Sequence, residues 1–284
     1  MPNNSISRRR FLQSTGAAAI WLPATVKGYT ASEMQALYVD GTMQEDISKW
    51  ELDTPALCVD LDLLETNIAT MQSTMMSNGI ACRPHAKTHK TPIIAQMQMD
   101  SGSVGICTAK ISEAETMFQH GIEEILMTTT NVTPTKIRRA MTLRLSCDSF
   151  IQATDSPENA RLLSEAAEAM GATADIVIDV DPGGHRTGIT SGEPALQLAQ
   201  LVDTLPALRL RGLLCYDGGS QHVKGFERRK TQTLERLAAA TETYDLFNGA
   251  GLNTDIFSGG GTGTYNIDHE TRGLTDVQLS LIHI

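Results

Sequence analysis

Aromatic residues are scarce in this 284-residue chain, at 5% of the sequence, and no apolar run approaches the length that spans a bilayer. Basic residues are also in the minority, with 23 Lys and Arg against 33 Asp and Glu, and the formal net charge is −10. Proteins that bind nucleic acid need a basic face, so this balance argues against a nucleic-acid partner. Hydrophobic residues still make up 41% of the chain. We therefore expect a sizeable core, packed by aliphatic side chains in a helix-rich α/β fold.

Paired cysteine patterns are absent as well. The five cysteines are odd in number, widely spaced and never in a C-x-x-C arrangement: Cys58, Cys82, Cys107, Cys147 and Cys215. Four of them lie in apolar runs that predict strands, and Cys147 comes just ahead of another such run. This pattern predicts buried, reduced thiols rather than a disulfide framework.

The N-terminus has the pattern of a twin-arginine export signal. Residues 7–12 (Ser-Arg-Arg-Arg-Phe-Leu) precede a short apolar run at 16–22, which is followed by Pro-Ala. We expect residues 1–30 to be a signal peptide, residues 31–53 to be a linker, and the protein to be periplasmic. This route carries folded proteins, so a cofactor inserted in the cytoplasm can travel with its enzyme. The alternative is a disordered basic tail.

From residue 54 onward, short apolar runs alternate with longer amphipathic stretches. The runs predict strands at 56–60, 80–82, 104–107, 124–127, 150–153, 175–180, 210–215 and 255–257. Helices are predicted between them, including 61–77, 157–170 and 225–244. Such alternation implies a parallel sheet, and about eight strand–helix units favour a (β/α)8 TIM barrel over residues 54–276 rather than a doubly wound sheet.

A lysine between two histidines is the most informative local feature. Residues 83–90 read Arg-Pro-His-Ala-Lys-Thr-His-Lys and follow a predicted strand. Neighbouring cations and partial burial lower the pKa of an amine such as Lys87, which can then form a Schiff base with an aldehyde such as pyridoxal phosphate. The alternative is a solvated basic loop. His85 and His89 either orient or charge the site, with His85 then a candidate catalytic residue, or simply pack at the barrel mouth.

A glycine-rich turn, Ser-Gly-Gly-Gly-Thr-Gly-Thr at 258–264, follows the last predicted strand. Without side chains in the way, its backbone N–H groups can converge on a phosphate, and Ser258, Thr262 and Thr264 can add hydroxyl groups. Turns of this composition also serve as flexible connections, which is the alternative here.

Two further polar segments come directly after predicted strands. Arg186 follows an Asp-Pro-Gly-Gly turn and can hold an anionic oxygen, unless it forms a structural salt bridge with Asp179 or Asp181. Tyr216 can stack on a ring or belong to the core, and residues 221–222 (Gln-His) are candidates for the substrate side. Strand ends of a parallel barrel carry its active site, so we expect all four motifs on one rim.

Three motifs together resemble a known family. Arg-Pro-His-x-Lys-x-His-Lys, Asp-x-Asp-x-Gly-x-x-Arg-x-Gly and Ser-Gly-Gly-Gly-Thr-Gly-Thr-Tyr look like the D-threonine aldolase / D-serine dehydratase group. Those are fold-type III pyridoxal phosphate enzymes with an alanine-racemase-like N-terminal barrel. The resemblance implies that Lys87 carries the cofactor as an internal aldimine and that Arg186 contacts its ring oxygen. It further implies that Tyr216 lies beside the ring and that the phosphate is cradled by Gly260, Gly261 and Thr262.

The resemblance also implies a lyase that splits β-hydroxy-D-amino acids into glycine and an aldehyde. The alternatives are a D-serine or 3-hydroxyaspartate dehydratase, an amino-acid racemase, or a non-catalytic pyridoxal phosphate-binding protein. Family members continue into a C-terminal β-domain with a divalent metal site, for example for Mn²⁺, and full-length members are expected to be homodimers. We expect residues 277–284 to be the truncated start of that domain. The chain as given should then bind cofactor but turn over little.

Overall fold

The computed structural model describes residues 28–39 and 42–280. The predicted export motif therefore lies outside the described residues. The chain divides into two compact units, Met1–Leu61 and Asp62–Ile284.

The described part of the first unit consists of short elements held by local hydrogen bonds. Helix α1 (Ala31–Ala36) begins at Thr30, whose hydroxyl accepts the Glu33 N–H at 3.3 Å while the Glu33 carboxylate accepts the Thr30 N–H at 2.9 Å. This reciprocal capping box satisfies two backbone donors that a helix start leaves free. Strands β1 (Tyr38–Val39) and β2 (Thr42–Met43) pair antiparallel, and η2 (Lys49–Glu51) is a single 3-10 turn.

The prediction of a strand at residues 56–60 is wrong. The segment has no regular structure, Leu57 is fully exposed, and Cys58 is exposed rather than buried. A short apolar run is compatible with a strand, but a strand forms only where a neighbouring strand completes its backbone hydrogen bonds. The other four cysteines are buried and free, as predicted.

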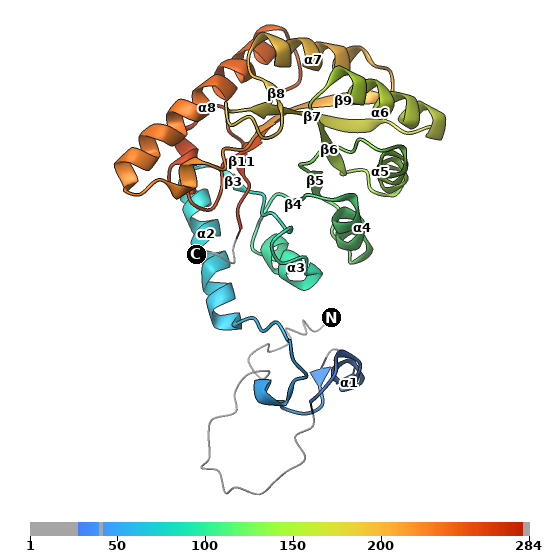
Figure 1. Cartoon of the computed structure of the whole chain (residues 1–284), viewed down its shortest axis with the longest axis vertical. Helices are drawn as coiled ribbons and strands as arrows, with labels where there is room; N and C mark the ends of the chain where they lie inside the picture. The colour runs from blue at the N-terminus through green and yellow to red at the C-terminus, as the bar shows by residue number, and fades with distance from the viewer. Residues whose placement is uncertain (1–27, 40–41, 281–284) are drawn as a thin grey trace, which may run out of the picture. The chain divides into compact units, whose positions relative to one another are not determined.

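Within the described residues, eight parallel strands form the second unit's barrel (Figure 1). They are β3 (Ala81–Cys82), β4 (Ile106–Thr108), β5 (Ile125–Met127), β6 (Ile151–Thr154), β7 (Ala174–Asp181), β9 (Leu208–Cys215), β10 (Ile256–Gly259) and β11 (Asp276–Val277). Each strand pairs with the next along the chain from β4 to β11, and β11 pairs with β3. The ring closes between β3 and β4, because the Cys107 N–H donates to Pro84 O at 2.7 Å and the Ala86 N–H donates to Cys107 O at 2.8 Å. The predicted (β/α)8 barrel is confirmed.

Helices form the outer layer around these strands (Figure 1). Helix α2 (Leu61–Ser77) precedes β3, and the strands are then joined through α3 (Pro92–Asp100), α4 (Ile111–Gln119), α5 (Pro134–Ser146), α6 (Pro157–Met170), α7 (Glu193–Thr204) and α8 (Phe226–Gly249). Short elements complete the unit: β8 (Ile189–Thr190), η3 (Ser220–His222) and η4 (Asp268–Glu270). Helix α6 has its predicted bounds, because Ser156 caps it, Pro157 opens it, and Gly171 ends it at a φ of 68°. None of the described helices is long and apolar enough to cross a membrane.

Alternate residues of the strands pack into two separate apolar clusters. One set, which includes Leu126, Val177 and Leu214, comes from strands alone and fills the barrel interior. The other set, including Ile125, Met127 and Ile178, packs with helix residues outside the barrel. This alternation follows from the two-residue side-chain period of a strand, and it leaves both faces of the sheet buried.

The last barrel strand corrects a predicted domain boundary. Val277 belongs to β11, which pairs with both β10 and β3, and Leu279 O accepts the His85 N–H at 2.7 Å. Residues 277–280 are therefore part of the barrel rather than the start of a following domain. The sequence gives little sign of this strand, since it is two residues long and contains the buried Asp276.

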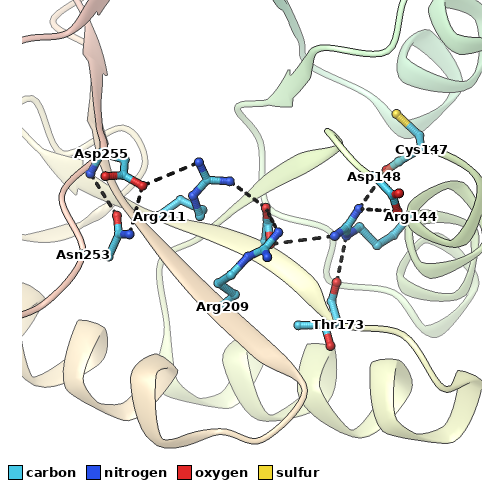
Figure 2. Close-up of polar contacts among 9 residues, drawn as sticks. Arg144, Cys147, Asp148, Thr173, Arg209, Arg211, Asn253 and Asp255 are labelled. Carbon is cyan, nitrogen blue, oxygen red and sulfur yellow. Dashed lines mark hydrogen bonds and ion pairs between the residues drawn. The ribbon is translucent and has the colours of Figure 1, made fainter.

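The N-terminal ends of β7 and β9 carry an ion cluster (Figure 2). Asp175, 1% exposed, accepts two hydrogen bonds from Arg209 at 2.6 and 2.7 Å and one from Arg211 at 2.8 Å. Arg144 reaches across from α5 and donates to Thr173 O at 2.7 Å, with one nitrogen 4.0 Å from Asp175. One buried carboxylate thus holds three guanidinium groups at the end of the strands away from Lys87.

Candidate active site

The four predicted motifs do follow barrel strands. Lys87 comes after β3, Arg186 after β7, Tyr216 after β9, and the glycine loop, defined here as residues 260–264, after β10. Parallel strands place their C-terminal ends at one rim, which in this architecture carries the active site.

Two of these motifs meet at the ring of Tyr216. The Lys87 Nζ lies 5.3 Å from the ring centroid, and the guanidinium carbon of Arg186 lies 5.2 Å from it. Both are cation–π distances. Lys87 is exposed as a residue, but its pKa is lowered from the usual 10.5, first by partial desolvation of the amine and then by the charge of Arg186. A larger share of the amine is therefore neutral near pH 7, the form that attacks an aldehyde.

The neighbouring Lys90 has a different environment. Its Nζ lies 2.5 Å from the carboxylate of Glu113, which is itself held by the Ala109 N–H at 2.9 Å. Lys87 has no carboxylate within ion-pair distance in the described part of the chain. Of the two lysines in the motif, Lys87 is therefore the one whose amine is not held by a carboxylate.

His85 acts on the backbone of the lysine motif. It is 4% exposed, its Nδ1 accepts the Lys87 N–H at 3.4 Å, and its Nε2 lies 3.2 Å from the Thr128 hydroxyl. Burial, followed by the charge of Lys87, holds its pKa well below the usual range. The ring is therefore neutral with its proton on Nε2, since Nδ1 is an acceptor. Burial also lowers the pKa of His89. Both histidines orient the motif rather than charge it, while a direct catalytic role for His85 stays a prediction.

Arg186 forms no ion pair with a carboxylate among the described residues, so the predicted alternative of a structural salt bridge is not found. Asp181 instead binds the nearby turn, accepting the Gly184 N–H at 2.8 Å and lying 3.2 Å from His185 Nδ1. Asp179 is 5% exposed, and burial raises its pKa to about 7 against the lowering effects of Thr187 and Arg186.

The glycine loop packs closely against the protein's own atoms. A Cβ at Gly260 would lie 2.2 Å from Asp268 Oδ2, and one at Gly263 would lie 2.4 Å from the Cβ of Gln221. A Cβ at Gly261 would lie 3.3 Å from a ring carbon of Tyr216. The loop thus lies directly beside the ring that Lys87 and Arg186 contact.

The hydroxyl groups predicted to bind phosphate already have protein partners. Ser258 is fully buried and donates to Asp276 Oδ1 at 2.5 Å, inside the barrel. Thr262 donates to Ser280 O at 2.9 Å and accepts the Ser280 N–H at 2.6 Å. The backbone N–H groups of Thr262 and Gly263 have no acceptor within the described residues. A phosphate at this loop would therefore be bound by backbone N–H groups rather than by Ser258.

Sequence reasoning missed two residues of the site. Gln221, considered only for the substrate side, donates to the Tyr216 hydroxyl at 3.3 Å and so helps hold that ring. Asp268 lies beneath the glycine loop, with Oδ2 accepting the Gly261 N–H at 3.0 Å. Only the Tyr-x-x-Asp that continues the turn places a carboxylate nearby in sequence, and this pattern has no meaning before the loop is folded.

The set of donors fits pyridoxal phosphate. An amine with a lowered pKa, a guanidinium group and an aromatic face lie together, and backbone N–H groups without acceptors among the described residues, including those of Thr262 and Gly263, are on the adjoining loop. These match the needs of the cofactor's aldehyde, its ring oxygen, its ring face and its phosphate. Among the described residues, no group of three His, Cys, Asp or Glu side chains is placed to hold a metal ion.

Comparison with known proteins places the chain in a family. The family model for the alanine racemase N-terminal domain matches residues 59–275. A 3-hydroxy-D-aspartate aldolase from Paracoccus denitrificans is 34% identical over 80% of this chain and 59% of its own length. A D-threo-3-hydroxyaspartate dehydratase from Delftia sp. is 31% identical over 80% of this chain and 60% of its own.

A solved structure agrees with these matches. D-threonine aldolase from Filomicrobium marinum superimposes with a TM-score of 0.78 at 36% identity, covering 81% of this chain and 62% of that one. The chain thus spans about 60% of the length of these relatives. The resemblance found in the three motifs is confirmed, and the chain belongs to the alanine racemase N-terminal domain family of fold-type III pyridoxal phosphate proteins.

Proposed function

We propose that the protein is a pyridoxal phosphate-dependent lyase that cleaves β-hydroxy-D-amino acids to glycine and an aldehyde. The observation that carries this proposal is the meeting of Lys87 and Arg186 at the Tyr216 ring, with the pKa of Lys87 lowered. It is supported by relatives that are aldolases for 3-hydroxy-D-aspartate and D-threonine.

Each residue has a distinct task in this proposal. Pyridoxal phosphate supplies an aldehyde for an amine and a conjugated ring that accepts electrons from a breaking bond. Lys87 provides the amine, and Arg186 holds an anionic oxygen on the ring. Tyr216 supports the ring face, held in place by Gln221. The glycine loop binds the phosphate. In the reaction the substrate's hydroxyl proton leaves, the Cα–Cβ bond breaks, and a proton is returned to Cα to give glycine.

A dehydratase is the second candidate. It is favoured by the 31% identity to D-threo-3-hydroxyaspartate dehydratase over the same part of the chain. In that reaction the Cα proton and the β-hydroxyl leave as water, and hydrolysis of the resulting imine gives a 2-oxo acid and ammonia. In either reaction a divalent cation such as Mn²⁺ would supply Lewis-acid chemistry at the β-oxygen, although no group of described side chains is placed to hold one.

We expect a form of the protein that spans the full length of its relatives to release glycine and an aldehyde from D-threonine and 3-hydroxy-D-aspartate, and to leave L-threonine unchanged. Glycine is measured by amino-acid analysis, the aldehyde by a coupled dehydrogenase, and ammonia is followed in parallel. Ammonia without glycine identifies the dehydratase, and interconversion of D- and L-alanine identifies a racemase. Preference for L-threonine would overturn the stereochemical assignment, which comes from the D-specific relatives.

We also propose that the protein is exported to the periplasm by the twin-arginine route. Replacing both Arg8 and Arg9 with lysine keeps the positive charge of the segment but removes the arginine pair. The variant should remain in the cytoplasm, as shown by cell fractionation and immunoblotting. The charge-matched control is Arg228→Lys, a substitution on helix α8, which should be exported like the wild type. Unchanged export of the double variant would rule out this route.

A further inference from the structure

Asp268 holds the glycine loop by two hydrogen bonds to one carboxylate oxygen. Its Oδ2 accepts the Gly261 N–H at 3.0 Å and the Thr264 hydroxyl at 2.8 Å. The carboxylate approaches so closely that a Cβ at Gly260 would lie 2.2 Å from Oδ2, and Gly260 itself has a φ of 62°. Residue 260 must therefore be glycine to admit this carboxylate, whether or not a ligand is present.

The carboxylate has no compensating cation. Asp268 is fully buried, forms no ion pair in the described part of the chain, and its Oδ1 has no hydrogen-bond partner there. The loop after β9 contributes the negative charge of Asp217. On η4 itself lie His269 and Glu270, and Lys230 of α8 is paired with Glu270 at 2.6 Å. Burial, with the charge of Asp217, raises the pKa of Asp268 to about 7.

We propose, building on the cofactor site proposed above, that Asp268 positions the glycine loop for the cofactor's phosphate as a neutral carboxylic acid. Binding of the phosphate is then coupled to protonation of the Asp268 carboxylate. The N–H groups of Thr262 and Gly263, which would donate to the phosphate, belong to the turn that Asp268 holds through the Gly261 N–H. A dianion there and a buried carboxylate would repel each other strongly. A proton on Oδ1, the oxygen without a partner, removes that repulsion while Oδ2 keeps both of its hydrogen bonds.

The test compares pyridoxal phosphate with pyridoxal, which lacks the phosphate but offers Lys87 the same aldehyde. Dissociation constants for both are measured by equilibrium dialysis between pH 6.5 and 9. Any pH effect on Lys87 enters both constants and cancels in their ratio. The free phosphate is mainly dianionic above pH 7, since its second pKa is about 6. The complex holds one proton that the free protein loses as the pH rises through about 7. The preference for the phosphate ligand should therefore fall about tenfold per pH unit above that point.

Two variants separate this proposal from a purely structural role. In Asp268→Asn, a neutral side chain of the same shape, the preference should stay constant over this pH range. In Asp217→Asn the fall should remain but begin at lower pH, because the charge that helps raise the pKa of Asp268 is gone. Binding of pyridoxal reports whether each variant is folded. A flat profile in the wild type, or an unchanged slope in Asp268→Asn, would overturn the inference. Capture of neither ligand by the wild type would instead refute the cofactor site itself.

Discussion

Substitution of Lys87 by alanine is expected to abolish covalent capture of pyridoxal phosphate. Lys87 has an amine of lowered pKa at the Tyr216 ring. Borohydride reduction of the wild type with cofactor should leave the label on the peptide that contains Lys87, as located by mass spectrometry. In Lys87→Ala the absorbance of the bound cofactor should also be lost.

The lysine three residues away provides a matched control. In Lys90→Gln the label should stay on Lys87, because the Lys90 amine is already held at 2.5 Å by Glu113, and glutamine can still donate a hydrogen bond to that carboxylate. Labelling of Lys90, or continued labelling of the Lys87→Ala variant at another lysine, would contradict the assignment of Lys87.

Substitution of Asp175 by alanine is expected to cost the protein about 3–5 kcal/mol in its free energy of unfolding. Removing the buried carboxylate leaves the guanidinium groups without their shared partner, and this costs most for Arg144, which is 10% exposed, and least for Arg209, which is 54% exposed and can be stabilised by water. Here Arg209 and Arg211 would lose their shared partner. Arg144 would lose part of its compensation as well. The measurement is denaturant-induced unfolding followed by circular dichroism.

The same cluster contains its own control. Asp255 is 62% exposed and lies 3.7 Å from Arg211, so Asp255→Ala should change the free energy of unfolding by less than about 1 kcal/mol, as is usual for exposed pairs. Equal effects of the two substitutions would show that Asp175 behaves as a surface charge. Asp175 lies at the N-terminal end of β7, whereas Lys87 follows the C-terminal end of β3, so folded Asp175→Ala should still capture the cofactor.

The barrel itself was largely predictable from the sequence. Apolar runs with helical stretches between them gave seven of the eight strands, and helices such as α2 and α6 have their predicted bounds. The errors lie at the two ends of the predicted barrel segment in the sequence, at residues 56–60 and at 276–277. Residues 56–60 are apolar but unpaired, whereas β11 is two residues long and partly polar yet pairs on both sides. Pairing depends on neighbours that are distant in sequence, and an apolar pattern does not identify them.

The roles of individual polar residues divide in the same way, into those that the sequence determines and those that only the folded structure decides. The sequence alone determined that Lys87, Arg186, Tyr216 and the glycine loop follow strands and so share one rim, because a parallel barrel places all strand ends together. Tertiary structure alone decided which lysine is held by Glu113, that the Ser258 hydroxyl serves the barrel core, and that Asp268 lies under the loop. Burial and charge at a residue come from groups far away along the chain. They become definite only when the chain is folded.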